Sequence, residues 1–205
     1  MTTGKKIRLS LAGGVLVLLA SCAGSNNQTE VTRAALPAMA WDHRPEAGQW
    51  TRATLAALQT DGAGLLKIVP RDIALFCPDY RNAGPADRAA FWSGMLSALA
   101  KFESTWRPEA SGGGGRWIGL VQIDPRTARG YGCAAQSVGA LKDGAANLAC
   151  AVRIVAAQVG RDELLVSEAG NWRGMARDWA PFRDPAKRAD MAAWTSRQSY
   201  CQTMS

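Results

Sequence analysis

The stretch PADRAAFWSGMLSALAKFESTWRP, residues 85–108, holds the clearest helical pattern of the chain. Its large apolar residues recur every three or four positions, which places them on one side of a helix. Pro85 suits the first helical position, where an N–H would lack a partner, and Asp87 is well placed for the helix dipole. Pro108 cannot continue a helix, so we predict that this one ends near residue 106.

Glu103 lies on the apolar face of this predicted helix, one turn beyond Leu99 and two turns beyond Leu96. Burial against apolar neighbours raises the pKa of a carboxyl group and keeps its proton available near neutral pH. A general acid in glycoside cleavage needs that property. From the spacing alone, a structural glutamate that is hydrogen-bonded to nearby backbone is the simpler interpretation.

Four short segments around Glu103 favour the catalytic interpretation instead. Residues 103–108 read ESTWRP and residues 119–123 read GLVQI, followed by PRTA at 125–128 and DGAANL at 143–148. Together they resemble the catalytic signature of lytic transglycosylases of the soluble-transglycosylase (SLT) domain family. The resemblance covers about residues 70–183, and the Glu-Ser pair with the Gly-Leu-x-Gln-Ile block is its most specific part.

The resemblance implies a mainly α-helical, lysozyme-like fold, similar to goose-type lysozyme, with little or no sheet and a groove that binds sugar. In that groove Glu103 would be the one catalytic residue. Ser104 would orient the acid or the substrate, and Gln122 and Asn147 would contact the sugar. Capping or turn hydrogen bonds are the alternative role for these polar side chains, for Asn147 in particular.

Three tryptophans near these segments are candidate substrate contacts, because indole rings stack on the C–H faces of sugars. Trp106 and Trp117 flank the two main segments, and Trp179 lies further along the chain. Core packing is the competing role for each of them.

The reaction that the resemblance implies takes place on peptidoglycan glycan strands. Glu103 would protonate the oxygen of the β-1,4 bond between N-acetylmuramic acid and N-acetylglucosamine. The same carboxylate would then take the proton of the muramyl 6-hydroxyl, which closes on C1 to give a 1,6-anhydro sugar. We expect no cofactor and no metal. The composition agrees with this expectation, because a single histidine, His43, excludes a multi-histidine metal site.

Two departures from the family pattern leave roles open. The fourth block reads ARDWAPFR at residues 176–183 and lacks the family's tyrosine, whose place Trp179 or Tyr131 would have to fill. Asp124 follows the Gln-Ile pair and would supply a second carboxylate for hydrolysis by a goose-lysozyme-like muramidase. A helix N-cap before Pro125 is the simpler role for Asp124. A non-catalytic peptidoglycan-binding lipoprotein and a purely structural lipoprotein are further alternatives.

The N-terminus has the pattern of a bacterial lipoprotein signal peptide. Three basic residues precede an apolar stretch at positions 9–20, which is too short for a stable membrane span. Residues 19–22 read LASC, which resembles a lipobox. We therefore predict a signal peptide over residues 1–21 and lipidation of Cys22.

The predicted mature protein consists of a flexible tether over residues 22–40 and a catalytic domain over residues 41–205. The tether is inferred from its polar, aperiodic beginning. Ala23 stands where an aspartate usually signals retention in the inner membrane. We therefore predict a lipid anchor in the outer membrane, facing the periplasm.

Charge and cysteine usage agree with an exported protein. The net charge of +7, from 24 basic and 17 acidic residues, falls to +4 without the three basic residues of the signal peptide. No basic run with interleaved aromatic residues is present, so we predict no nucleic-acid partner. We also expect a monomer. Besides Cys22, four cysteines remain, and they allow three disulfide pairings. We favour Cys133–Cys150, across the groove walls, and Cys77–Cys201, between the two ends of the domain, since no C-x-x-C spacing supports a zinc site.

The rest of the chain also reads as mainly helical. We predict helices over residues 46–59 and 143–159, a helical start near residue 125, and a last helical region at 163–180 that a basic tail follows. No β-α-β alternation is present, so any sheet must be small.

Overall fold

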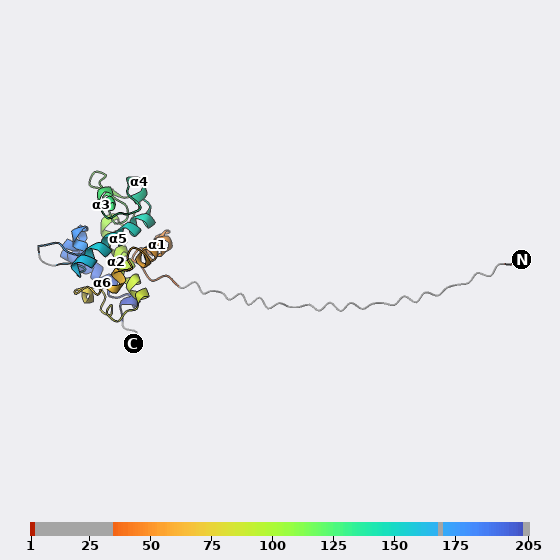
Figure 1. The fold of residues 1–205 in the computed structure, drawn as a ribbon, viewed down its shortest axis with the longest axis horizontal. Coiled ribbons are helices and arrows are strands. Elements are labelled where there is room, and N and C mark those ends of the chain that lie inside the picture. Colours follow the sequence, from red (N-terminus) through yellow and green to blue (C-terminus); the bar gives the residue numbers. More distant parts are fainter. Residues whose placement is uncertain (3–34, 168–169, 203–205) are drawn as a thin grey trace. The chain divides into compact units, whose positions relative to one another are not determined.

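The computed structural model describes residues 1–2, 35–167 and 170–202 of the chain. Residues from Ala35 onward form one unit (Figure 1). The predicted signal peptide beyond residue 2, the lipidation site Cys22 and the tether up to residue 34 lie outside the described residues. In the described part of the chain, no helix combines the length and the apolar character that a membrane span requires.

The unit is mainly helical, as the sequence predicts. Its helices are α1 (Ala47–Gln59), α2 (Pro85–Ser104), α3 (Pro125–Gly130), α4 (Val138–Leu141), α5 (Gly144–Asp162) and α6 (Pro185–Thr195). Short 3-10 turns lie at Leu65–Lys67, Ile73–Leu75, Met175–Arg177, Ala180–Arg183 and Ser199–Cys201. Within the described residues, the only sheet pairs β1 (Ser111–Gly112) antiparallel with β2 (Trp117–Ile118). The predicted fold class, α-helical with very little sheet, is confirmed.

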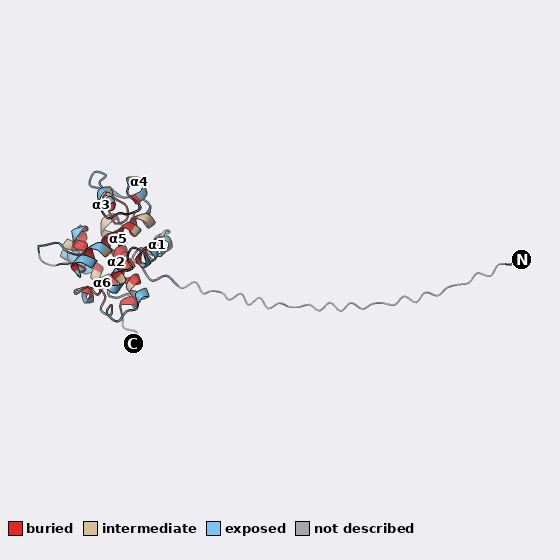
Figure 2. Cartoon of the chain, viewed as in Figure 1, coloured by how far each residue is buried: buried red, intermediate tan, exposed pale blue. Residues whose placement is uncertain are grey.

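Helix α2 lies at the centre of the unit (Figure 2). Every residue from Ala89 to Ala100 is buried, because α1, α6 and the last 3-10 turn pack around the helix. Gly94 permits a close approach there, since a Cβ atom at this position would stand 2.2 Å from the hydroxyl of Tyr200. Helix α2 is therefore a core helix, enclosed on all sides over most of its length.

The C-terminal end of α2 sets the direction of the chain into the site. The helix begins at Pro85, as predicted, and ends at Ser104, slightly before the predicted end. Thr105 and Trp106 both have a φ of 54°, in the left-handed region that ends helices. This reversal leads the chain away from the helix axis and into the β1–β2 hairpin.

The prediction of a helical region at residues 163–180 is wrong. Helix α5 ends at Asp162, and the described residues after it form loop and 3-10 turns until α6 begins. Side chains satisfy the backbone here in place of helical carbonyls. The two carboxylate oxygens of Asp72 accept hydrogen bonds from the N–H groups of residues 165 and 166, each at 2.8 Å. A segment whose N–H groups are held in this way cannot continue as a helix.

Helix α6 lies in the stretch that was predicted to be a tail. Asp184 caps it, since its carboxylate accepts from the N–H groups of Ala186 and Lys187 at 2.9 and 3.1 Å. Pro185 occupies the first helical position. This Asp-Pro start is a helix signal that the sequence does contain.

Both predicted disulfides are confirmed. Cys77 pairs with Cys201 with a Cα–Cα distance of 4.7 Å, and Cys133 pairs with Cys150 at 5.2 Å. The first bridge ties the segment before α2 to the last 3-10 turn, and the second ties the turn after α3 to α5.

We expect loss of the Cys77–Cys201 bridge to destabilise the unit more than loss of Cys133–Cys150. The bridged cysteines are 124 and 17 residues apart, and a longer loop restricts the unfolded chain more. Chain entropy alone predicts that replacing both cysteines with alanine lowers the free energy of unfolding by about 5 kcal/mol for the long bridge and about 3 kcal/mol for the short one. Urea denaturation of the two double variants measures the difference, and a larger loss for the short bridge would contradict it.

Candidate active site

Glu103 lies in the last turn of α2, next to the left-handed residues that end the helix. Its side chain is half-buried, and no described residue forms a hydrogen bond or an ion pair with its carboxyl group. Burial raises the pKa of Glu103 to about 7, while the positive charges of Lys187 and Arg183 act in the opposite direction. Near neutral pH this carboxyl group can therefore both give and accept a proton.

The carboxyl group of Glu103 opens on a cavity of about 440 Å³. The cavity is lined by Glu103, Trp117, Gln122, Asp178, Ala180 and Arg183. A second hollow of about 480 Å³ adjoins it on the side of α6 and shares Glu103 as a lining residue. Of the predicted site residues, the structure brings Glu103, Trp117 and Gln122 together here. Trp117 is 43% exposed, so its ring is accessible to a ligand.

Gln122 reaches the cavity from a tight turn that follows β2. The turn needs backbone in the left-handed region, with φ of 84° at Gly119 and 49° at Gln122. A Cβ atom at Gly119 would come within 2.3 Å of the Asn147 amide, so only glycine fits there. The Gln122 side-chain amide donates to the carbonyl of Gly119 at 2.9 Å and thereby closes the turn. Gln122 thus both lines the cavity and holds its own loop in place.

Three side chains from different elements hold the backbone of this turn at residues 118–121. From α5, Asn147 accepts from the N–H of Val121 at 3.0 Å and donates to the carbonyl of Ile118 at 2.9 Å. From α2, Ser104 donates its hydroxyl proton to the carbonyl of Leu120 at 2.8 Å. From the C-terminal segment, the indole N–H of Trp179 donates to the carbonyl of Val121 at 2.8 Å.

These contacts correct the predicted substrate-binding roles of Ser104, Asn147 and Trp179. Their exposed fractions are 4%, 0% and 2%, so a sugar cannot reach them while the loop is in place. Their polar atoms form hydrogen bonds with the backbone of a buried loop, because buried N–H and C=O groups need partners inside the protein. The three residues position the Gln122 turn, and Trp179 also lines a small hollow beside Trp117, Gln122 and Asp178.

Trp106 also departs from its predicted role as a sugar platform. Its indole N–H donates to the carbonyl of Ser97 at 2.9 Å, and its ring meets that of His43 edge to face at 4.6 Å. It is absent from the lining of the cavity and of the adjoining hollow. The left-handed backbone after α2 directs Trp106 back along the helix, where it packs against the residues before α1.

Asp124 caps α3, which is the simpler of the two roles that the sequence predicts for it. Its carboxylate accepts from the N–H of Arg126 at 2.8 Å, at the start of α3, and from the guanidinium of Arg116 at 2.8 Å. The Arg126 N–H and then Arg116 lower the pKa of Asp124 below its usual value. Asp124 is therefore an ionised, fully partnered N-cap.

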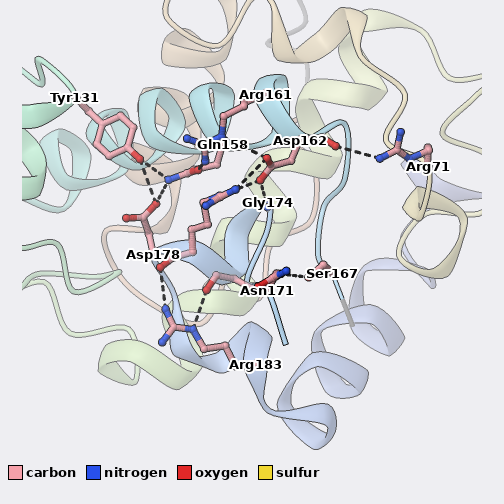
Figure 3. Close-up of polar contacts among 12 residues, drawn as sticks. Arg71, Tyr131, Gln158, Arg161, Asp162, Ser167, Asn171, Gly174, Asp178 and Arg183 are labelled. Atoms are coloured by element: carbon pink, nitrogen blue, oxygen red, sulfur yellow. Dashed lines mark hydrogen bonds and ion pairs between the residues drawn. The ribbon is translucent and has the colours of Figure 1, made fainter. Parts of the chain in front are cut away.

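Asp178 is a carboxylate in the cavity that the sequence reasoning missed (Figure 3). It accepts hydrogen bonds from the side-chain amide of Gln158 on α5 and, at 3.4 Å, from the hydroxyl of Tyr131. Tyr131 was one of two candidates for the place of the absent family tyrosine. The Tyr131 hydroxyl contacts the cavity lining through its hydrogen bond to Asp178. Trp179, the other candidate, donates its indole N–H to the carbonyl of Val121.

The structure adds two further charged residues near Glu103. Arg183 lies in the ARDWAPFR block at residues 176–183, and Lys187 lies on α6, a helix that the spacing of apolar residues does not predict. No group of three or more side chains with metal-ligating atoms occurs in the part of the chain that the structure describes.

Comparisons with known proteins agree with this geometry. The family model of the transglycosylase SLT domain matches residues 82–167, a range that contains Glu103, the Gln122 turn and Asn147. Among solved structures, a glutamate-to-glutamine variant of DslA (Bd0314) matches with a TM-score of 0.75 and 29% sequence identity. Wild-type DslA (form 2) matches with a TM-score of 0.73 and 28% identity. Each match covers 82% of this chain and 100% of the DslA chain, and a second DslA variant has a different glutamate replaced by glutamine.

A search of curated protein sequences finds no match to this chain. The family model contains Glu103 in its matched range, and the DslA structures match 82% of the chain. Residues 82–167 therefore match the transglycosylase SLT domain, the helical unit is similar in fold to DslA, and both similarities support an action on peptidoglycan.

Proposed function

We propose that this protein is a peptidoglycan lytic transglycosylase. It cleaves the β-1,4 bond between N-acetylmuramic acid and N-acetylglucosamine and leaves 1,6-anhydro-muramyl ends. The observation that carries this proposal is the carboxyl group of Glu103, which has no hydrogen-bond partner among the described residues, a pKa of about 7 and direct access to a cavity. Trp117 and Gln122 line the same cavity and supply a stacking face and a polar contact for sugar rings.

The reaction uses the two protonation states of Glu103 in turn. Protonated Glu103 gives its proton to the glycosidic oxygen as the bond from that oxygen to C1 of the muramyl ring breaks. Positive charge develops at C1 and the ring oxygen, as in glycoside cleavage generally. The Glu103 carboxylate then takes the proton of the 6-hydroxyl while O6 bonds to C1. Glu103 is protonated again at the end, and no water is consumed.

The second candidate function is hydrolysis, as in a muramidase, and Asp178 is the observation that favours it. Asp178 lines the Glu103 cavity, whereas Asp124 is engaged as an N-cap. In the DslA structures, two different glutamates have been replaced by glutamine. In this chain Glu103 is the only glutamate that lines the cavity, so the second carboxylate there is that of Asp178. The two reactions differ in their products, because an anhydro end is one water lighter than a reducing end.

We expect Glu103→Gln to lower cleavage by at least about 100-fold, the contribution typical of a general acid. The change keeps the size of the side chain and removes its proton donor. Mass spectrometry of the muropeptides released from purified peptidoglycan measures both the rate and the type of end. Glu109→Gln is the matched control, since Glu109 is exposed and pairs with Lys142 outside the cavity. Wild-type release by the Glu103 variant would refute the proposal, and reducing ends from the wild type would favour hydrolysis.

We expect activity to be lost on the alkaline side. Glu103 must be protonated at the start of the reaction, so the rate should fall about tenfold per pH unit above a pKa of about 7. The folded protein binds this proton more tightly than the unfolded chain, whose pKa is 4.5. The resulting stabilisation is present below pH 4.5 and is lost as the pH rises to about 7. Urea denaturation should therefore show that Glu103→Gln gains stability relative to the wild type between these pH values, and a constant difference would contradict the raised pKa.

We also propose that Cys22 carries a lipid anchor and that the enzyme faces the periplasm from the outer membrane. The LASC segment at residues 19–22 and the following Ala23 support this proposal. In cells fed labelled palmitate, the full-length protein should be labelled and should sediment with outer membranes. The Cys22→Ala variant should lack the label and leave that fraction. An unlabelled wild-type protein would rule out lipidation.

A further inference from the structure

The hollow that adjoins the Glu103 cavity differs from it in charge. It has a volume of about 480 Å³ and is lined by Phe102, Glu103, Ala180, Pro181, Arg183, Asp184 and Lys187. Its carboxylate other than Glu103, that of Asp184, is used in capping α6. Arg183 lines both the hollow and the Glu103 cavity, and Lys187 lines the hollow alone. We refer to Phe102, Arg183 and Lys187 as the cationic subsite.

Arg183 is a fixed cation in this subsite (Figure 3). Its guanidinium donates to the carbonyls of Ala176 and Arg177, both at 2.8 Å, and lies 5.4 Å from the ring centre of Trp172. These contacts hold the group in place without neutralising its charge. Among the described residues, no carboxylate lies within ion-pair distance of Arg183.

Lys187 is the second cation, and Lys101 provides a direct comparison with it. Both ammonium groups lie over the ring of Phe102, at 5.9 Å for Lys187 and 5.1 Å for Lys101. Lys101 pairs with Asp190 at 2.8 Å and does not line the hollow. Lys187 lines it, and within the described part of the chain no carboxylate pairs with it. The two lysines differ in partner and in access to the hollow, although they share one aromatic ring.

The position of these two cations is unfavourable for a general acid, because positive charge makes a carboxyl group lose its proton more easily. Their charges lower the pKa of Glu103 and so work against the burial that keeps its proton in place. The other charged groups that face Glu103 across the two hollows are Asp178 and Asp184, and both accept hydrogen bonds from the protein. A bound anion would cancel the unfavourable effect of the cations.

We propose that the cationic subsite binds a carboxylate on the muramyl side chain of the substrate, next to the bond that is cleaved. This inference rests on the proposed function and specifies the substrate for the same site. Two sources of that carboxylate exist in peptidoglycan: the stem peptide and, where the peptide has been removed, the lactyl group. Binding of either neutralises Lys187 and Arg183, which raises the pKa of Glu103 in the complex and couples recognition of the muramyl side chain to proton transfer.

Lys187→Gln tests this inference, with Lys101→Gln as the matched control. Both residues are exposed, so neither change should impair folding. The substrates are soluble glycan strands in three forms: with intact stem peptides, with the peptides removed by an amidase, and with all carboxylates converted to methylamides by carbodiimide coupling. Cleavage is followed by mass spectrometry of the ends, so a failure of the transglycosylase reaction itself is seen separately, on every substrate.

We expect Lys187→Gln to raise KM for the intact strands about two- to fivefold, as for loss of a solvent-exposed ion pair. On the methylamide strands the variant and the wild type should have the same KM. An effect on intact strands that disappears after amidase treatment assigns a stem-peptide carboxylate. An effect on both forms shows that the subsite accepts either carboxylate, because the lactyl carboxyl group is an uncharged amide until the peptide is removed. Equal effects of Lys187→Gln on intact and methylamide strands, or no effect on any form, would overturn the inference, as would the same behaviour in Lys101→Gln.

The pH dependence gives a second readout that a structural role would not change. In the free enzyme, removal of the Lys187 charge should move the alkaline limb of kcat/KM to higher pH. On intact strands the alkaline limb of kcat should stay where it is, because the bound carboxylate already neutralises Lys187 in the wild-type complex. Lys101→Gln should shift neither limb, and a Lys187→Gln profile identical to that of the wild type would count against the coupling.

Discussion

The hydrogen bonds that hold the backbone of residues 118–121 are the constraint on which the site depends. Asn147, Ser104 and Trp179 bring α5, α2 and the C-terminal segment to one short stretch of loop. Buried backbone groups need such partners, since water cannot reach them. The left-handed turn of Gln122 follows directly, so the loop keeps a fixed place beside the end of α2. Because Glu103 adjoins Ser104, one set of contacts positions both sides of the cavity.

Two opposing effects, burial and nearby positive charge, set the pKa of Glu103. Burial in the last turn of α2 raises its pKa, and the cations of the C-terminal segment and α6 lower it. A deeper acid would hold its proton too tightly to act as a base, and an exposed one would lose it near neutral pH. The protein reaches a pKa of about 7 with one carboxyl group that has no hydrogen-bond partner among the described residues. Both steps of the proposed reaction need that intermediate value.

The elements that the sequence predicts well are those with strong local signals. Helices α1, α2 and α5 begin within one residue of their predicted starts, because capping residues and apolar spacing act over a few positions. The region at 163–180 was wrongly predicted to be helical, since its N–H groups bond to the side chains of Asp72, which is distant in the chain, and of Asp162, which ends α5. For the same reason, the sequence could nominate Asn147 and Trp179 as site residues but could not separate support of the loop from contact with sugar.

The amino-acid sequence by itself determined the helical class and the family motifs, and it nominated Glu103 and the four cysteines that pair. These depend on residue type and on spacing along the chain, which the sequence contains directly. Only the tertiary structure decided which residues share the cavity with Glu103. Trp117 and Gln122 line the cavity, whereas Trp106 packs against His43. Lys187 lines the adjoining hollow from α6, a helix that was not predicted. Such neighbours are set by the packing of distant segments around α2, and that packing has no signature in local spacing.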